Sequence, residues 1–402
     1  MTSERLFTPR FFWMCAFTFT VFLSLFQLIP TAPFHVRDLG GGSLASGLFL
    51  GFLTFASAWS GPFTGAFADR NGRRRTLIAA SLCLAGFTAT YSVIHSYPVL
   101  LALVLLHGIV WSSLLAASAA YLTGVLPPAR RGEGIAYWGM SSVLAAAVAP
   151  SVGFWLYSHG WVYLCAVTTL LNLTMAVIAW CMVDDRSAAH GAHAAHSGFI
   201  EWRVVALSAP LFLYSYSYGT VSSFSAVFAD ARGIHPKSIY LTTFAVTTLL
   251  TRPFLGRFGD RIGYRRIFLP SLVIMTLGMI ALTFSNTRLG LQFSASAFAL
   301  GFGTAYPAFA AYVMQGVGHE RRGAAFGAIL AAFDTGIGAG STMSGWLIGR
   351  HGFPTAFGLA AALSALALPA FLLSERRFGH HTETIPPLPE ARGPELAPLV
   401  ED

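Results

Sequence analysis

The sequence predicts an all-α membrane protein with twelve transmembrane helices in two homologous six-helix halves. Only 10% of the 402 residues are charged and 55% are hydrophobic, whereas soluble domains carry about 25% charged residues. Hydrophobic runs long enough to cross a bilayer recur along the chain, and part of the sequence repeats at an offset of 191 residues, from Pro62 to Pro253. These observations exclude a water-soluble enzyme, a disordered chain and a disulfide-stabilised scaffold.

Each predicted helix is an apolar run bounded by charged or turn-forming residues, and about 20 apolar residues are enough to cross the hydrocarbon core. The runs cover residues 11–33, 45–66, 76–94, 98–122, 134–157 and 161–182, and then residues 202–229, 238–258, 266–285, 289–314, 324–348 and 353–374. The first run is too long for a secretory signal peptide and lacks a small-residue cleavage site. We therefore interpret it as the first transmembrane helix.

Polar segments divide the chain into four parts. We expect an N-terminal half over residues 1–182, a linker over 183–201, a C-terminal half over 202–374 and a tail over 375–402. The linker consists mainly of small and polar residues. The tail contains many proline and glutamate residues and few that could be buried, so we expect it to be disordered.

The basic residues predict the orientation in the membrane. Twelve spans place both termini on one side, and nineteen of the 25 basic residues fall on that side. The opposite side carries Arg37, Arg232, Lys237, Arg288 and Arg350, and Arg252 falls inside a span. Because basic residues accumulate in cytoplasmic loops, we expect a multi-pass protein of a bacterial inner membrane with its termini, linker and tail in the cytoplasm. The net charge of +8 then reflects orientation rather than binding to nucleic acid.

The two halves are predicted from an internal repeat. Residues shared by the two copies are Pro62, Gly65, Phe67, Asp69, Arg70, Gly72, Arg74 and Arg75, which recur as Pro253, Gly256, Phe258, Asp260, Arg261, Gly263, Arg265 and Arg266. Arg131-Gly132 recurs as Arg322-Gly323 at the same offset. Eight identities within fourteen positions are not expected by chance. Repeated halves of this kind hold a substrate site at their interface near the midplane of the membrane.

The stretch from Gly65 to Arg75 (GAFADRNGRRR) closely resembles the loop 2–3 signature of the major facilitator superfamily, and residues 256–266 are a degenerate copy of it. The resemblance extends over residues 11–374 and is greatest to bacterial twelve-helix sugar- and drug-efflux permeases. It implies transport by alternating access. Residues 149–153 (APSVG) match the antiporter motif of these permeases only in part, and Val104 stands where an arginine linked to proton exchange is expected.

The same resemblance implies a conformational latch that holds the halves together on the cytoplasmic side while the pore faces outward. Its predicted residues are Gly65, Asp69, Arg70, Gly72, Arg73, Arg74, Gly256, Asp260, Arg261 and Gly263. Glycine permits sharp turns and close helix contacts, the aspartates suit a helix N-terminus or an arginine, and the arginines suit anionic headgroups. The alternative is that this cluster only sets the topology.

Two charged residues fall deep inside predicted spans, where ionisable groups are costly and usually functional. At about 1.5 Å per residue, Arg252 lies about 12 Å and Asp334 about 18 Å along their helices from the cytoplasmic end. Their counterparts in the other half are Gly61 and Val143, so each charge belongs to one half alone. Three interpretations stay open: a structural Arg252–Asp334 pair, a pair that couples proton or substrate movement, and no pair.

The remaining candidates for substrate or coupling contacts are polar and aromatic residues inside spans: His107, Gln27, Tyr214, Tyr218, Trp111 and Tyr306. An imidazole is able to carry a proton near neutral pH, although a packed, hydrogen-bonded histidine is the alternative. Gln27 is uncharged and is a candidate substrate contact. The seventh run is rich in hydroxyl groups, which need partners in a membrane. We expect Tyr214 and Tyr218, four residues apart, to line an aqueous cavity, with interhelical packing as the alternative.

These observations together predict a secondary active transporter and not an enzyme. We expect efflux of a drug, sugar or metabolite, with protons as the candidate coupling ion. The alternative is a proton-coupled uptake symporter or facilitator for a small organic anion or sugar. We expect the partners to be a small-molecule substrate and the lipid bilayer, and the protein to be a monomer. No cofactor or metal is expected: His190, His193 and His196 lack supporting ligands, and Gly336, Gly338 and Gly340 indicate helix packing rather than phosphate binding.

Overall fold

The computed structural model describes residues 6–127, 130–183, 202–317 and 322–378, which form thirteen helices and no strand. The helices of the N-terminal half are α1 (Pro9–Asp38), α2 (Ser43–Asn71), α3 (Arg73–Tyr91), α4 (Tyr97–Val125), α5 (Arg131–Ser158) and α6 (Trp161–Cys181). Those of the C-terminal half are α7 (Trp202–Leu207), α8 (Ala209–Ala231), α9 (Ile239–Ile262), α10 (Tyr264–Phe284), α11 (Arg288–Gln315), α12 (Arg322–His351) and α13 (Phe353–Phe378). Twelve long helices thus confirm the predicted fold class.

Within the described residues, eight of the helices are long and apolar enough to cross a membrane by length and composition alone. The four long helices outside this set are α3, α8, α9 and α12. Arginines at the start of α3 and the hydroxyl groups of α8 lower their hydropathy. These helices cross as part of a bundle, where neighbouring helices supply partners for polar groups.

The predicted seventh span, residues 202–229, is interrupted and was wrong as a single helix. A six-residue helix, α7, ends at Leu207, and α8 begins after Ser208 with Pro210 in its first turn. Proline has no N–H to donate, which suits the first turn of a helix, where that N–H has no partner within the helix. The break therefore occurs where the sequence changes from a short amphipathic segment to the membrane-crossing helix. At the other end of this half, α13 continues to Phe378, four residues past the predicted end of the last span at residue 374.

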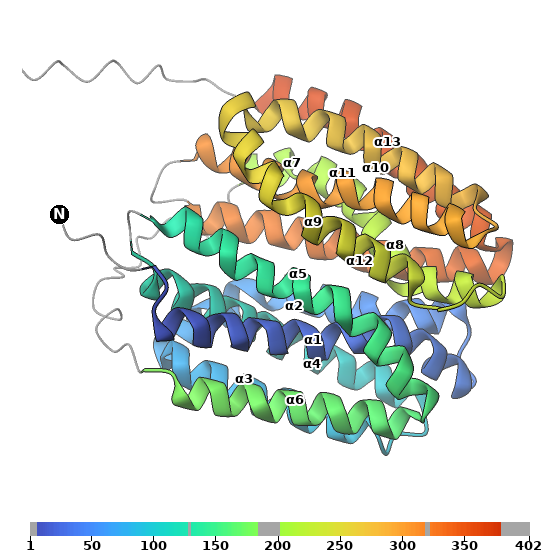
Figure 1. Ribbon diagram of the computed structural model, residues 1–402, viewed down its shortest axis with the longest axis horizontal. Coiled ribbons are helices and arrows are strands. Elements are labelled where there is room, and N and C mark those ends of the chain that lie inside the picture. The colour runs from blue at the N-terminus through green and yellow to red at the C-terminus, as the bar shows by residue number, and fades with distance from the viewer. Residues whose placement is uncertain (1–5, 128–129, 184–201, 318–321, 379–402) are drawn as a thin grey trace, which may run out of the picture.

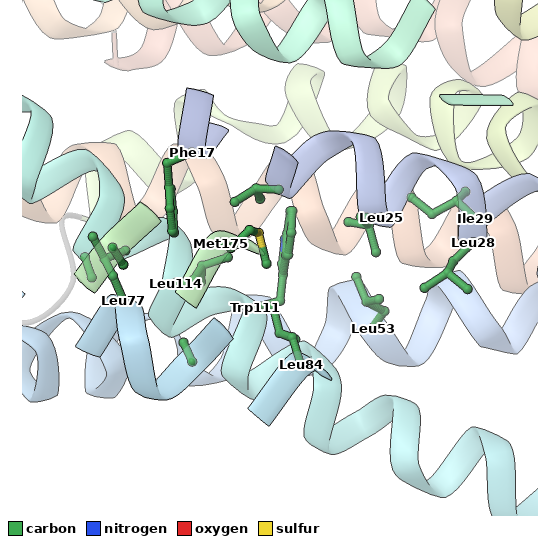
Figure 2. Packing of buried hydrophobic residues seen from close by; sticks show 14 of the residues in the cluster. Phe17, Leu25, Leu28, Ile29, Leu53, Leu77, Leu84, Trp111, Leu114 and Met175 are labelled. Atoms are coloured by element: carbon green, nitrogen blue, oxygen red, sulfur yellow. The ribbon is translucent and has the colours of Figure 1, made fainter. Parts of the chain in front are cut away.

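The two halves lie side by side (Figure 1), and each half has its own hydrophobic core. The first core uses residues from Leu6 to Met182, and part of it is shown in Figure 2, where Trp111 and Met175 pack among leucines. The second core uses residues from Val204 to Phe371. Among the buried members described, each core includes one side chain from the other half: Ile337 of α12 joins the first core and Phe34 of α1 joins the second.

The internal repeat is visible in the backbone of the two equivalent turns. Gly72, between α2 and α3, has φ +89° and ψ 133°, and Gly263, between α9 and α10, has φ +93° and ψ 137°. A side chain is strained at such positive φ, so glycine is required at both positions. The two glycines are 191 residues apart, the same offset that relates the sequences of the halves.

Helix α12 lies between α2 of one half and α8 of the other, and its glycines alternate between the two neighbours. A Cβ atom at Gly336 or Gly340 would collide with α8, at Phe212 and Tyr216 respectively. A Cβ atom at Gly338 would lie 2.6 Å from Oγ1 of Thr54 on α2. These glycines therefore serve close helix packing, as the sequence indicated.

The halves make several direct contacts at the end of the bundle remote from the first turn of α1 and the last turn of α13 (Figure 1). Ser341 donates a hydrogen bond of 2.7 Å to the carbonyl of Gly47. Ser151 lies 3.1 Å from the Ser238 hydroxyl, and the Lys237 ammonium lies 4.8 Å from the ring centre of Phe34. The bundle is therefore closed at this end.

Candidate functional site

Asp334 lies at the contact between α12 and α2. Its Oδ2 atom accepts a hydrogen bond of 2.9 Å from the Ser57 hydroxyl. The next residue back, Phe333, packs on Tyr306 of α11 with 4.7 Å between the ring centres. Asp334 is half-buried, so the carboxylate lies deep in the bundle while part of the residue remains accessible. It therefore connects the halves through an ionisable group.

Arg252 lies at the contact between α9 and α5. Its Nη1 atom donates a hydrogen bond of 3.3 Å to the carbonyl of Gly139, and a Cβ atom at Gly139 would lie 3.1 Å from Nη2. A guanidinium has five N–H donors, and this is the hydrogen bond that Arg252 makes among the described residues. Glycine at position 139 thus leaves room for the guanidinium against the backbone of α5.

The two charges occupy equivalent contacts of opposite sign. The repeat relates α2 to α9 and α5 to α12, so the α2–α12 contact of Asp334 corresponds to the α9–α5 contact of Arg252. Each charged side chain belongs to the C-terminal half and bonds to the N-terminal half. Among the described residues no ion pair joins Arg252 to Asp334. Of the three interpretations of Arg252 and Asp334, this state therefore agrees with the one without a pair, because each side chain has a partner across its own helix contact.

A small cavity of about 40 Å³ lies between α1 and α5 on one side and α8 and α9 on the other. Its lining residues are mainly apolar: Phe26, Ile29, Pro30, Ala146, Pro150, Tyr218, Ser222, Leu241, Phe244 and Ala245. Tyr218 stacks on Phe302 with 4.5 Å between ring centres and 8° between ring planes. The ring centres of Tyr218 and Phe244 are 5.8 Å apart. The interface between the halves is therefore aromatic at this level.

The structure separates the two tyrosines that the sequence grouped. Tyr218 borders the cavity between the halves. Tyr214 is fully buried in the second core against Phe268 and Phe302 and does not line this cavity. Several of the α8 hydroxyl groups also bond within their own half: Ser217 to Ser364, and Thr220 to Ser344 at 2.8 Å. The expected water-facing role is therefore wrong for Tyr214 in this state, because Phe268 of α10 and Phe302 of α11 pack against it.

The other candidates lie within the halves. Nδ1 of His107 lies 3.1 Å from the Tyr91 hydroxyl, and the ring stacks on Phe87. Trp111 packs edge-on against Phe22, 5.7 Å between ring centres. The amide of Gln27 donates to the Leu23 carbonyl at 3.0 Å, while its buried Oε1 makes no hydrogen bond among the described residues. His107 thus has the packed, hydrogen-bonded surroundings of the alternative interpretation.

Arginines of the repeated motif tie the last helix of each half to the rest of that half. Arg74 donates to the carbonyls of Ala179 (3.2 Å) and Trp180 at the end of α6. Its equivalent, Arg265, forms a bidentate pair with Glu375 in the last turn of α13, at 2.7 and 3.0 Å. These contacts hold helix ends within one half and do not cross between halves.

The other predicted latch residues make no close contact between halves that the structure describes. Arg70 is exposed and Arg73 half-buried, and a Cβ atom at Gly65 would meet nothing within 4 Å. The close packing expected of Gly65 is therefore not seen in this state, whereas Gly72 and Gly263 form the expected turns. The side chains of Asp69, Asp260 and Arg261, and the surroundings of Gly256, lie outside the described residues, as do His190, His193 and His196. Among the described residues no group of three or more potential metal ligands occurs.

Sequence reasoning missed Ser57, Gly139, Phe244 and Phe302. The two charges were recognisable because charge is rare in apolar runs. Ser57 and Gly139 carry no such signal, since serine and glycine are common in membrane helices. An aromatic residue at the interface also looks the same in sequence as one that packs in a core.

Twelve crossing helices in two repeated halves, with charged groups at the contacts between them, define a class of membrane transporter. The family model of the Major Facilitator Superfamily matches residues 12–241 and 211–395. An uncharacterized MFS-type transporter of Escherichia coli strain K12, YhhS, is 24% identical over 365 residues, covering 88% of this chain and 89% of YhhS. An uncharacterized MFS-type transporter of Burkholderia mallei strain SAVP1 is 25% identical over 366 residues, covering 88% of each chain.

Solved structures share the fold at low sequence identity. A point mutant of the nucleoside transporter NupG has a TM-score of 0.76 at 15% identity, covering 91% of this chain and 100% of that one. The human organic anion transporter MFSD10 has a TM-score of 0.68 at 16% identity, with the same coverage. The chain belongs to the major facilitator superfamily and is a multi-pass membrane transporter.

Proposed function

We propose that the protein is a secondary active transporter that exports a small organic solute from the cytoplasm, driven by a proton gradient. Alternating access exposes a site between the halves first to one side of the membrane and then to the other. We propose a monomer in a bacterial inner membrane, with its termini, linker (183–201) and tail (375–402) in the cytoplasm. The arginine-rich turn between α2 and α3 lies at the same end of the bundle as the first turn of α1 and the last turn of α13 (Figure 1), which supports this orientation.

The observation that carries the proposal is the position of both intramembrane charges at the contacts between halves. The Ser57–Asp334 and Arg252–Gly139 hydrogen bonds each join one half to the other. Rocking of the halves must break or rearrange both bonds. In the proposed orientation, the contacts at Gly47, Ser151 and Phe34 close the periplasmic end, and we assign this state to the cytoplasm-facing part of the transport cycle. The predicted latch would form only after the opposite movement.

Asp334 is the group we propose for proton coupling. A carboxylate that takes up a proton avoids the cost of charge within a membrane. Protonation also weakens its bond with Ser57, because a hydrogen bond to a charged acceptor is about twice as strong as a neutral one. Proton uptake would therefore loosen α12 from α2, while deprotonation would tighten the contact. This links the charge of one residue to the separation of the halves.

Export is supported by the partial antiporter motif on α5. Gly153 in that motif packs against α1, where a Cβ atom would lie 3.0 Å from Cα of Gln27, so the motif forms a close helix contact within the N-terminal half. The second candidate is proton-coupled uptake of a small organic anion. The positive charge of Arg252 at the interface favours it.

Counterflow in proteoliposomes with a panel of metabolites tests transport directly. If a solute is transported, its labelled form accumulates inside proteoliposomes that were preloaded with the unlabelled form, without any imposed ion gradient. Repeating the assay with an imposed pH gradient of either sign tests coupling and direction. Failure of every solute to exchange would refute transport, and flux that is unchanged by the pH gradient would refute proton coupling. Gradient-driven accumulation inside right-side-out vesicles would favour uptake over export.

A further inference from the structure

The proposed transport function leaves the chemical class of the solute open. The residues at the interface between the halves restrict which classes of solute can bind there. We propose that the solute is an organic anion with a ring-sized apolar part. Its anionic group binds Arg252, and its apolar part occupies the cavity at Tyr218 and Phe244. This inference rests on the proposed function, because it assigns a substrate class to the same interface.

The first step concerns the charge of Arg252. The residue is half-buried inside a membrane helix and cannot be neutralised, since arginine does not lose its proton in proteins. Its hydrogen bond among the described residues is a single one, of 3.3 Å, to the Gly139 carbonyl. Among the described residues, no partner satisfies its four further N–H donors or its positive charge. A carboxylate, sulfonate or phosphate that binds the guanidinium through two hydrogen bonds supplies both requirements.

Asp334 does not supply this counter-charge in the structure. Its Oδ2 atom accepts from Ser57 on α2, whereas Arg252 reaches α5. The two side chains thus occupy different helix contacts. The carboxyl group also has an option that arginine lacks, because it can bind a proton and become neutral. We therefore expect the anionic solute to neutralise the charge of Arg252 and a proton to neutralise the charge of Asp334.

The second step concerns the cavity. None of the described residues that line it is charged, and the polar side chains among them are Tyr218 and Ser222. The volume of about 40 Å³ in this closed state holds a water molecule or two and no solute, so binding requires the halves to part at this level. The walls that then face a solute include the rings of Phe244 and Tyr218, and Phe302 stacks behind Tyr218. Aromatic side chains bind flat apolar groups through offset or edge-on contacts.

The third step concerns the distance between the two features. Ala245 lines the cavity, and Arg252 follows it seven residues later on α9. This separation is about 10 Å along a helix. The guanidinium bonds to Gly139, which lies seven residues before the cavity-lining Ala146 on α5. A solute that contacts both features therefore has to span about 10 Å between them. A sugar would leave its hydroxyl groups without partners in the aromatic cavity, and an organic cation would meet Arg252 with like charge.

Binding to the purified protein in detergent tests the inference without transport. The probes are benzoate, 2-naphthoate and phenyl phosphate, each a ring-bearing anion. Benzamide and 2-naphthamide are uncharged analogues of two of them, and acetate is an anion without a ring. Titration calorimetry and ligand-induced thermal stabilisation give the affinities. We expect ring-bearing anions to bind, and both the amides and acetate to bind about tenfold more weakly or not at all.

Variants assign each part of the ligand to its site. Arg252→Gln should lower the affinity for ring-bearing anions about tenfold or more, and Arg252→Lys should lower it less, because lysine keeps the charge without the bidentate geometry. Phe244→Ala should weaken 2-naphthoate and leave acetate unchanged. Arg232→Gln is the matched control, since Arg232 is exposed at the closed end beside Phe228 and Asn286. Size-exclusion profiles and melting temperatures show whether each variant remains folded.

The outcomes separate this inference from the proposed function. Equal binding of anions and amides, unchanged anion binding by Arg252→Gln, or no binding of any ring-bearing anion at millimolar concentration would overturn the inference. Counterflow of another solute would then leave the transport function standing. Conversely, Arg252-dependent binding of these anions without exchange of any solute would support the inference and refute transport.

Discussion

Ser57 on α2 donates a hydrogen bond of 2.9 Å to Asp334 on α12, so an ionisable group inside the membrane joins the two halves of the protein. At the equivalent contact on the other side of the interface, Arg252 bonds to the backbone of α5. The repeat gives both halves the same helix arrangement, yet the two equivalent contacts carry opposite charges. This asymmetry suits a transporter in which a proton and a solute act at different contacts.

Asp334→Asn should remove the response of transport to a pH gradient while keeping counterflow. An asparagine still accepts a hydrogen bond from Ser57 but cannot take up or release a proton. Counterflow exchanges solute for solute without net proton movement, so it does not require proton transfer at position 334. The measurement is labelled-solute flux in proteoliposomes with and without an imposed gradient. Ser57→Ala serves as the comparison, because it loses a charge-assisted hydrogen bond of about 1.5–3 kcal/mol but keeps the carboxyl group. Gradient-driven flux at the wild-type rate in Asp334→Asn would disprove the assigned role.

Gly47→Ala should disfavour the state that is closed at the end remote from the termini. The added Cβ atom would collide with the backbone carbonyl of Ser341 across the α2–α12 contact. Overpacking of this kind costs about 1–3 kcal/mol, which changes the ratio of closed to open molecules about five- to 150-fold.

The readout for Gly47→Ala is the thiol reactivity of a cysteine introduced at Ser238, a buried residue at the same closed end. The background lacks the exposed Cys83 and Cys181. Reactivity should rise in Gly47→Ala. Gly86→Ala is the matched control, because a Cβ atom there meets nothing within 4 Å. Equal reactivity in both variants would show that Gly47 does not control closure.

The Arg265–Glu375 pair should contribute modestly to stability and should weaken in salt. Its side chains are 47% and 19% exposed, so solvent screens the attraction and we expect a coupling energy of about 0.5–1 kcal/mol. A double-mutant cycle with Arg265→Gln and Glu375→Gln measures it from denaturant unfolding in detergent. The exposed Arg130–Glu133 pair, of similar geometry but local in sequence, should couple less. A larger coupling for Arg130–Glu133 would contradict the view that Arg265 ties α13 to α10.

His107→Phe should destabilise the protein without changing the response of transport to pH. The ring remains able to stack on Phe87, but the Tyr91 hydroxyl loses its buried partner, at a cost of about 1–3 kcal/mol. Adding Tyr91→Phe should restore part of this stability, because replacing both partners with apolar groups is nearly neutral. Unfolding experiments and pH-gradient flux give the two readouts. A variant with normal stability but no gradient response would make His107 a proton carrier.

The sequence predicted the fold well because its main determinants are local. The length and composition of each apolar run decide whether it crosses the membrane, and the offset from Gly72 to Gly263 reveals the two halves. The same kind of reasoning found Arg252 and Asp334, since a charge in an apolar run is evident without knowing its neighbours. The break at Ser208 was missed, because Pro210 is compatible with both the first turn of a helix and a kink inside one.

The contacts of the site depended on tertiary structure. Tyr214 and Tyr218 share one face of α8, yet Tyr214 lies in the second core and Tyr218 at the interface, because neighbouring helices cover the two positions differently. The opposite charges of Arg252 and Asp334 and their depths in the membrane are compatible with an ion pair. The helices nevertheless place Arg252 at the α5–α9 contact and Asp334 at the α2–α12 contact. By itself the sequence determined which segments enter the membrane and which charges they carry, since these follow from the preferences of single residues for lipid or water. Only the packing of α2 against α12 and of α5 against α9 decided what each charge touches, because that depends on which residues from distant parts of the chain meet.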